Sequence, residues 1–348
     1  MHGLFFHVCE CETTVTSRAA LNPVNKRAEY QKRGLRPREE RDMQQKNAAD
    51  RLSPLYIIIA GALWGSMGLF VRRLGDAGCN SAEIAQLRSL VTAVILFLFL
   101  IIKERNLLRI RLRDIWCFIG TGVLSIVFFN LCYFTTIELT SLSVAAVLLY
   151  TAPAFVIVLS AILFKEQITK RKVIALILTF VGCVCVSGLI RGGASMTLKG
   201  FLIGIGAGVG YALYSIFSRF ALERGYNSLT ISFYTFFFAV FGTIPFVSMN
   251  RVLRAVTTSV GQTAFILLFG IVTTVLPYLL YTKGLEGVEN GKASILASVE
   301  PVVATILGTL VFHEILHADE ICGILLILGA ILISNRSSSV TEHDQQPI

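Results

Sequence analysis

The chain has 348 residues, of which 54% are hydrophobic and only 15% are charged. Together with a mean hydropathy of +0.70, this composition excludes an ordinary soluble globular protein and is typical of a helical protein that crosses the membrane several times. The net charge of +9 does not indicate nucleic-acid binding, because the basic residues gather in short loops between apolar stretches.

The chain begins with a polar segment, residues 1–52, which we expect to be a disordered cytoplasmic tail. Ten apolar stretches follow, each near the roughly 20 residues that a helix needs to cross the hydrocarbon core. They lie at about 54–74, 81–102, 115–136, 141–164, 172–190, 197–219, 228–248, 262–283, 289–312 and 319–335. A second polar tail occupies residues 337–348. Because the stretches are continuously apolar, the expected fold is an all-α integral membrane protein with ten transmembrane helices.

The basic residues predict the orientation of these helices. Loop 103–114 carries five lysine and arginine residues and loop 165–172 carries four, whereas loops 137–141 and 312–319 carry none. Cytoplasmic loops are enriched in lysine and arginine. We therefore expect both termini in the cytoplasm and the protein in the plasma or inner membrane of the cell.

The apolar part of the chain contains two copies of one pattern, at residues 53–190 and 197–336. Residues that recur at a spacing of 147 or 148 include Arg72 and Arg219, Asn80 and Asn227, Tyr133 and Tyr281, Pro153 and Pro301, and Glu166 and Glu314. Each copy holds five predicted spans, so the second copy must enter the bilayer from the opposite side. Inverted repeats of this kind are typical of secondary transporters, which bind substrate near the midplane between the two halves.

Pro153 and Pro301 are repeat-related prolines inside predicted spans. Each removes a backbone donor and opens its helix locally. Freed carbonyl groups at membrane depth are tolerated only within protein or beside a wet cavity. The paired helix kinks therefore point to a binding site, and a purely structural kink is the alternative.

Glu300 lies in the middle of a predicted span, beside Pro301 and on the same helix as Ser298. A carboxylate at this depth must be paired, protonated or in contact with water. Glu300 is therefore a candidate for solute binding and for proton coupling. A structural cap on backbone donors near the kink is the alternative.

Two basic residues are also candidates. Lys283 ends a predicted span and is a coupling candidate that could pair with Glu286, Glu289 or Glu300, although a cytoplasmic anchor is the favoured interpretation. Arg88 lies near the outer end of a predicted span, five positions after Glu83, and we expect the two to form an exposed pair there. Contact of Arg88 with the substrate is the alternative.

The doubled pattern resembles the EamA-like family of the drug/metabolite transporter superfamily over about residues 53–336. In the first copy the resemblance rests on Trp64-Gly65-Ser66, Arg88, Ala152-Pro153, Phe164-Lys165-Glu166 and Gly182. In the second copy it rests on Tyr211-Ala212-Leu213-Tyr214, Glu300-Pro301-Val302, Phe312-His313-Glu314 and Gly329. It implies a ten-helix bundle with a central cavity, and export or exchange of small metabolites without ATP. The glycine that is usual before the glutamate in this family is Lys165 in one copy and His313 in the other.

The resemblance also places aromatic and neutral polar residues on the spans that the family uses for its cavity. Phenol and indole groups suit a pocket for partly apolar solutes, although such residues near helix ends are also ordinary membrane-interface anchors. The candidate cavity residues are Trp64, Ser66, Asn130, Tyr133, Tyr150, Tyr211, Tyr214, Tyr278, Tyr281, Ser298 and Glu300.

Residues 313–317, His-Glu-Ile-Leu-His, match the H-E-x-x-H motif of zinc metalloproteases. An intramembrane zinc protease that uses His313, Glu314 and His317 is therefore the alternative function. Two observations oppose it. The repeat-related segment 165–169 has no histidine, and the motif straddles the turn between two predicted spans, where a helical i, i+4 pair of ligands is not expected.

We therefore expect a secondary transporter, not an enzyme, that moves a small metabolite such as an amino acid by alternating access, and by resemblance exports it. It needs no cofactor or metal in this interpretation, and its partners are the solute and the lipid bilayer, with a homodimer also compatible with the sequence. A channel or sensor is a further alternative. The sequence does not identify the solute.

Overall fold

The computed structural model describes residues 52–192 and 197–335. The predicted tails lie outside this part, apart from Leu52. Every regular element in the described ranges is helical, and nine helices there are long and apolar enough to cross a membrane. They are Leu52–Asp76, Ser81–Lys103, Leu112–Leu139, Leu142–Phe164, Leu198–Glu223, Ser228–Phe246, Val260–Gly284, Asn290–Phe312 and Ala318–Asn335. The predicted all-helical, multi-span class is confirmed.

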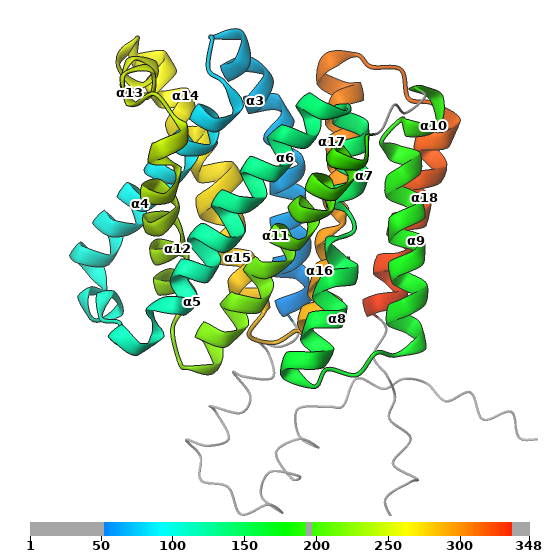
Figure 1. The fold of residues 1–348 in the computed structure, drawn as a ribbon, viewed down its shortest axis with the longest axis horizontal. Helices are drawn as coiled ribbons and strands as arrows, with labels where there is room; N and C mark the ends of the chain where they lie inside the picture. Colours follow the sequence, from blue (N-terminus) through cyan, green and yellow to red (C-terminus); the bar gives the residue numbers. More distant parts are fainter. Residues whose placement is uncertain (1–51, 193–196, 336–348) are drawn as a thin grey trace, which may run out of the picture. The chain divides into compact units, whose positions relative to one another are not determined.

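The stretch predicted as the fifth span forms α9, Lys170–Val186, which has only 17 residues and is followed by the short α10, Leu189–Gly192. Helix α9 lies beside α18, Ala318–Asn335 (Figure 1). A Cβ atom added to Gly323 would lie 2.6 Å from the carbonyl oxygen of Gly182. Glycine at these two positions therefore allows the two backbones to touch.

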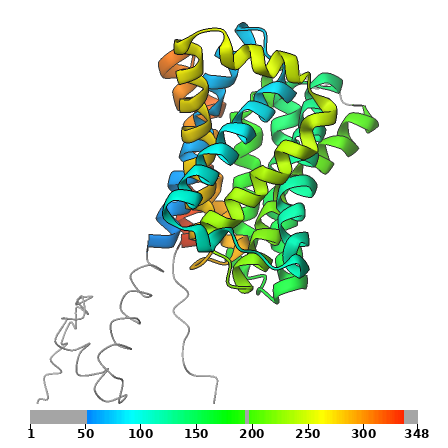
Figure 2. The same ribbon diagram turned by 90° about the vertical axis from the view of Figure 1, so that its left-hand side faces the viewer.

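The remaining spans are built from one or more helices each, which run between the same two ends of the bundle (Figure 2). Before α9 these are α3 (Met67–Asp76), α4 (Ser81–Lys103), α5 (Ile115–Ile119), α6 (Phe128–Leu139), α7 (Leu142–Leu149) and α8 (Ala152–Phe164). After α10 they are α11 (Leu198–Glu223), α12 (Ser228–Thr243), α14 (Val260–Gly270), α15 (Leu276–Gly284), α16 (Asn290–Ala297) and α17 (Val299–Phe312). Helix α13 (Met249–Thr257) lies in the connection between the span that ends at Phe246 and the span that begins at Val260.

Two spans are divided next to the repeat-related prolines. Helix α7 ends at Leu149, and Pro153 is the second residue of α8. Helix α16 ends at Ala297, and Pro301 is the third residue of α17. Proline fits the first turn of a helix, where its missing N–H would have no partner, but it cannot continue a preceding helix. Each proline therefore begins the second half of a broken span.

Two further spans contain π-helical segments at matching positions, Gly120–Val127 between α5 and α6 and Ile271–Val275 between α14 and α15. Their last residues are 148 positions apart. A π-helical turn holds an extra residue, which rotates the following side chains relative to an α-helix, and such turns are frequent at functional sites.

Helices α8 and α17 end in the same way. Their C-cap residues, Lys165 and His313, adopt the left-handed conformation with φ of 57° and 54°. In both, the N–H of the next glutamate donates to the carbonyl six residues earlier, at 3.3 and 3.4 Å. Glycine adopts this conformation without steric cost, whereas a residue with a Cβ atom is strained in it.

The first span packs closely against the broken span formed by α16 and α17. Cβ atoms added to Gly61 and Gly65 would each lie 2.6 Å from a backbone carbonyl oxygen, that of Ala297 and that of Glu300. This contact brings the neighbouring Trp64, which is only 6% exposed, into the core between the two copies of the pattern.

Candidate functional site

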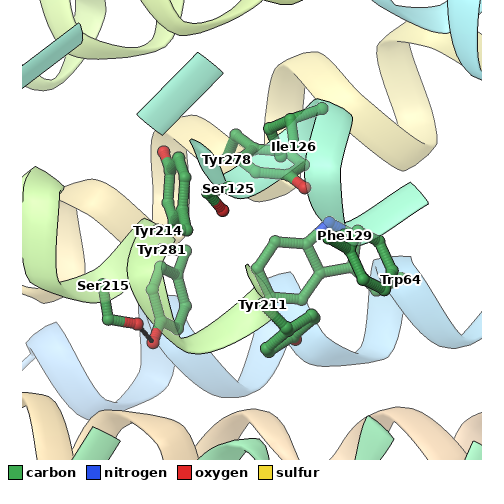
Figure 3. Close-up of a pocket in the computed structure, with 9 residues that line it drawn as sticks. All are labelled: Trp64, Ser125, Ile126, Phe129, Tyr211, Tyr214, Ser215, Tyr278 and Tyr281. Carbon is green, nitrogen blue, oxygen red and sulfur yellow. Dashed lines mark hydrogen bonds between the residues drawn. The ribbon is translucent and has the colours of Figure 1, made fainter. Parts of the chain in front are cut away.

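Aromatic side chains from three spans meet inside the bundle (Figure 3). The Trp64 ring centroid lies 5.1 Å from that of Tyr278 and 5.3 Å from that of Tyr281, both on α15. Tyr214, on α11, lies 4.9 Å from Tyr278, and Tyr211, one turn earlier, lies 6.3 Å from Trp64. Most of these pairs meet edge to face, the arrangement that aromatic quadrupoles favour.

These rings line a narrow pocket (Figure 3). Its lining residues are Trp64, Ser125, Ile126, Phe129, Tyr211, Tyr214, Ser215, Tyr278 and Tyr281. Five of them are predicted cavity residues. The π-helical segment Gly120–Val127 supplies Ser125 and Ile126, and the second π-helical segment directly precedes the helix that carries Tyr278.

The polar groups around the pocket differ in whether they are already hydrogen-bonded. The Tyr214 hydroxyl lies 2.7 Å from that of Thr282, and the Tyr281 hydroxyl lies 2.8 Å from that of Ser215. By contrast, the indole N–H of Trp64 and the hydroxyl of Ser125 are buried without a hydrogen-bond partner. These groups are available to a bound solute or to water.

Glu300, in the first turn of α17, adjoins this pocket. Its carboxylate accepts a long hydrogen bond, 3.5 Å, from the Tyr211 hydroxyl. The ring centroid of Tyr133 lies 5.7 Å from that of Phe129, which lies 5.7 Å from that of Tyr211, and Tyr150 packs against the core cluster that contains Trp64. Of the predicted cavity residues, Tyr211 is the one that contacts the Glu300 carboxylate.

Three predicted cavity residues donate hydrogen bonds to their own helices. The Ser66 hydroxyl, the Asn130 amide and the Ser298 hydroxyl reach backbone carbonyls three or four positions earlier, at 2.7, 2.6 and 3.2 Å. None of the three lines the pocket. The acceptor for Asn130 is Ile126, in the π-helical segment, so this amide satisfies a carbonyl that the widened turn leaves available.

The predicted coupling residue Lys283 lies at the exposed end of α15. Its ammonium group pairs with Glu286 at 2.5 Å, and not with Glu300.

The expected pair between Arg88 and Glu83 is wrong. Glu83 pairs with Arg251, at 2.7 Å, and also completes the capping box with Asn80 at the start of α4. Arg88 is only 4% exposed, and its nearest polar contact is the sulfur of Met67 at 3.4 Å. The predicted ion pair was wrong because two residues five positions apart do not lie on the same face of a helix.

At one end of the bundle, where α8 ends (Figure 1), Glu166 connects the two copies of the pattern. Its carboxylate accepts hydrogen bonds from the backbone N–H groups of Asn290 (2.8 Å) and Gly291 (3.2 Å), the first two residues of α16. Lys172 lies 3.6 Å from the same carboxylate, and Arg219 donates to the Asn290 side chain at 3.0 Å. We call this the Glu166 end.

At the opposite end, where α17 ends, the repeat-related glutamate has a different partner. Glu314 pairs with Arg72 at 2.6 Å, and both side chains are about half exposed. The N-terminus of α7, which is repeat-related to α16, is capped by its own Ser141, whose hydroxyl accepts from the Val144 N–H at 3.2 Å. We call this the Glu314 end. Sequence reasoning identified both glutamates as repeat mates but did not predict either contact.

The zinc-protease alternative is not supported. His313 has the left-handed conformation and residues 313–317 are not helical, so the two histidines do not share a helix face. Glu314 is engaged by Arg72. Within residues 52–192 and 197–335, no group of three histidine, cysteine, aspartate or glutamate side chains is placed to hold a metal ion.

The chain is similar to known proteins over most of its length. The model of the EamA-like transporter family matches the chain twice, at residues 51–188 and 198–336. An uncharacterized transporter of Archaeoglobus fulgidus is 28% identical over 284 residues, which cover 80% of this chain and 95% of that protein. The uncharacterized transporter YetK of Bacillus subtilis is 24% identical over 252 residues, covering 71% and 76%. A solved crystal structure, 18% identical, shares the fold with a TM-score of 0.68 over 81% of this chain and 96% of its own.

Proposed function

Because the chain belongs to the EamA-like transporter family, we propose that it is a secondary transporter that carries a small, partly apolar metabolite through the aromatic pocket by alternating access. The observation that carries this proposal is the difference between the two ends of the bundle. Glu166 holds a helix of the other copy, whereas its repeat mate Glu314 does not.

Ten spans in two oppositely inserted copies are part of the proposal. We count α9 as a span, since its 17 residues cover about 26 Å, slightly less than the roughly 30 Å of the hydrocarbon core. Its close packing along α18 and the matching caps of α8 and α17 support a structural repeat. Residues 190–196 then lie outside, and both termini lie in the cytoplasm. Topology reporters that place 190–196 and the C-terminus on one side of the membrane would refute this arrangement.

The Glu166 end is the closed end in this proposal. The first N–H groups of a helix have no partner within the helix and carry the positive end of its dipole, so a carboxylate is favourable there. Glu166 belongs to the first copy and α16 to the second, so this contact holds the two copies together. It would have to break for a solute to leave on that side.

In the alternate state, we expect the equivalent contact to form at the Glu314 end. The residues repeat-related to Asn290 and Gly291 are Leu142 and Ser143, the first residues of α7. Glu314 would leave Arg72 and accept from their N–H groups while Glu166 releases α16. Because one contact replaces an equivalent one, the two states differ little in free energy, as alternation requires.

Glu300 is the proposed coupling group, since it adjoins the pocket and can carry a proton when the solute is absent. Exchange of a proton for solute at this carboxylate would drive export. We expect Glu300→Gln to lose accumulation against a gradient while exchange at saturating solute continues. Accumulation by the variant at the wild-type level would exclude this role.

Counterflow tests the transport proposal directly. The solute is first sought by comparing the metabolites in medium from cells with and without the protein. Purified protein in liposomes loaded with that unlabelled solute should then take up the labelled solute transiently and saturably. Non-saturable flux that does not depend on solute inside the vesicles would indicate a channel instead.

A further inference from the structure

The connection between α4 and α5 is strongly basic, and we call its residues 103–113 the basic loop (Figure 1). It carries one acidic residue, Glu104, and five basic residues, so its net charge is +4. The basic residues are Lys103, Arg105, Arg109, Arg111 and Arg113, and all five are exposed. Within the described ranges no carboxylate lies within 4.0 Å of any of these five charges.

Hydrogen bonds fix the backbone of the basic loop on the end of the bundle. The Tyr234 hydroxyl, on α12, donates to the carbonyl of Leu108 at 2.7 Å. The N–H of Arg111 donates to the Tyr226 hydroxyl at 3.1 Å. Both tyrosines belong to the second copy of the pattern, so the loop of the first copy is attached to the second at two points. Its charges are therefore held in place rather than free to spread apart.

The conformation of the basic loop directs its arginines outward. The backbone is extended at Arg109 (φ −83°, ψ 115°) and at Arg111 (φ −82°, ψ 134°). Successive side chains of an extended backbone point to opposite sides. Ile110, between the two arginines, packs against the core cluster that contains Phe118. Both guanidinium groups therefore point away from the bundle.

Two apolar side chains show that these charges lie at the level of the lipid headgroups. The basic loop leads directly into the span Leu112–Leu139, and Leu112 is 84% exposed although it lies between Arg111 and Arg113. Trp116, one turn further along, is 40% exposed. Tryptophan is enriched where a membrane meets water. A soluble anion would give Leu112 no apolar contact, whereas a phospholipid offers acyl chains beside its phosphate.

Other basic residues in comparable connections are compensated within the protein. In the second basic connection at the same end of the bundle, Lys172 is nearly buried and lies 2.6 Å from Glu289. In the connection that is repeat-related to the basic loop, Arg251 of α13 pairs with Glu83 at 2.7 Å. Uncompensated charge is therefore a property of the basic loop and does not follow from a basic sequence alone.

We propose that the basic loop binds the headgroups of anionic phospholipids, with Arg109, Arg111 and Arg113 at their phosphates and Leu112 against their acyl chains. The guanidinium fork matches the geometry of a phosphate. Basic clusters directly beside a membrane span attract anionic lipids. Binding does not depend on the proposed transport function, and only the choice of the cytoplasmic leaflet rests on the proposed orientation.

Energy transfer from tryptophan to labelled lipid measures this binding in the full chain. The chain has two tryptophans, so Trp64→Phe leaves Trp116, three residues after Arg113, as the donor. Nanodiscs of phosphatidylcholine receive a trace of phosphatidylglycerol or phosphatidylcholine that carries a dansyl group on an acyl chain. We expect transfer to the anionic lipid to be at least about twofold greater. The excess should disappear in about 1 M NaCl, where the screening length is about 3 Å.

Variants of the basic loop assign the contact. The triple variant Arg109→Gln, Arg111→Gln, Arg113→Gln should lose the excess transfer, and Arg109→Lys, Arg111→Lys, Arg113→Lys should retain most of it. The matched control is Lys170→Gln, Lys199→Gln, Arg254→Gln, which removes the same charge at exposed positions outside the loop and should behave as the parent does.

Two further arms separate a lipid from a soluble anion. Leu112→Ser should lower the excess transfer without changing the charge. Inorganic phosphate should reduce the excess no more than NaCl of the same ionic strength does. A phosphate effect beyond that of NaCl would identify a site for soluble phosphate and overturn the lipid assignment.

Equal transfer to the two labelled lipids in the parent would overturn the proposal. It would also be overturned if the glutamine variant kept the excess, or if the matched control lost as much. Counterflow measurements do not enter these outcomes, so failure of the lipid site and failure of the transport proposal are distinguishable.

Discussion

The carboxylate of Glu166 lies 2.8 Å from the backbone nitrogen of Asn290, 124 residues further along the chain. This hydrogen bond joins a loop of the first copy to the start of a helix in the second. No equivalent contact is made by Glu314, which pairs with the half-exposed Arg72. The two repeat-related glutamates therefore make different contacts in the described conformation. Their contributions to the free energy of unfolding should differ accordingly, and this difference can be measured.

Glu166→Ala should lower the free energy of unfolding more than Glu314→Ala does. The first substitution leaves two helix N–H groups without their charged acceptor, at a cost of about 1–3 kcal/mol. The second removes an exposed ion pair, which contributes less than about 1 kcal/mol. Denaturant titration in mild detergent compares the two. Equal losses would show that Glu166 does not hold the copies together.

Glycine at either left-handed cap should stabilise the protein. Lys165 and His313 have positive φ, which costs a residue with a Cβ about 1 kcal/mol relative to glycine. Lys165→Gly and His313→Gly should each raise the midpoint of thermal denaturation. Alanine at the same positions is the control, because it removes the side chain but keeps the Cβ. An equal gain from alanine would mean that the backbone conformation is not the cause.

Gly323→Ala should destabilise the pair of helices α9 and α18. Its new Cβ would lie 2.6 Å from the backbone oxygen of Gly182, which cannot move without displacing α9, and we expect a loss of about 1–3 kcal/mol. Gly329→Ala is the matched control on the same helix, since nothing lies within 4 Å of its added Cβ. There, alanine should be neutral or should stabilise by up to about 1 kcal/mol. Similar effects at both positions would contradict the close packing of these helices.

The sequence was sufficient to predict the all-helical, multi-span class and the family. A membrane helix is a local feature, because its length and apolar character follow from the bilayer itself. Trp64 and the tyrosines of α11 and α15 were named as cavity candidates because they are large polar-tipped side chains on spans that the resemblance assigns to the cavity, and the structure places them around one pocket. The other residues that line this pocket were not named. Ser125 and Ile126 reach it from a π-helical segment, whose hydrogen-bond pattern has no signal in composition or periodicity.

The sequence also did not allow us to predict which charged residues pair when they lie far apart in the chain. Glu83 and Arg251 are separated by the pocket-forming spans, and nothing in the local pattern around either residue indicates the other. Arg88 was expected at the membrane surface and instead lies in the core. Such contacts depend on how the spans pack, which hydropathy does not encode.

In the proposed transport cycle, the contact between Glu166 and the start of α16 alternates with an equivalent contact between Glu314 and the start of α7. Distances between pairs of spin labels at the two ends of the bundle test this alternation most directly. In a background without native cysteines that still transports, one label pair is placed at Gln167 and Glu286, at the Glu166 end. The second is placed at their repeat mates, Ile315 and Glu138, and all four positions are exposed. When solute or a gradient shifts the equilibrium between the two states, we expect the distance between the first pair of labels to lengthen as the distance between the second pair shortens. Two distances that stay constant, or that change in the same direction, would contradict the claim.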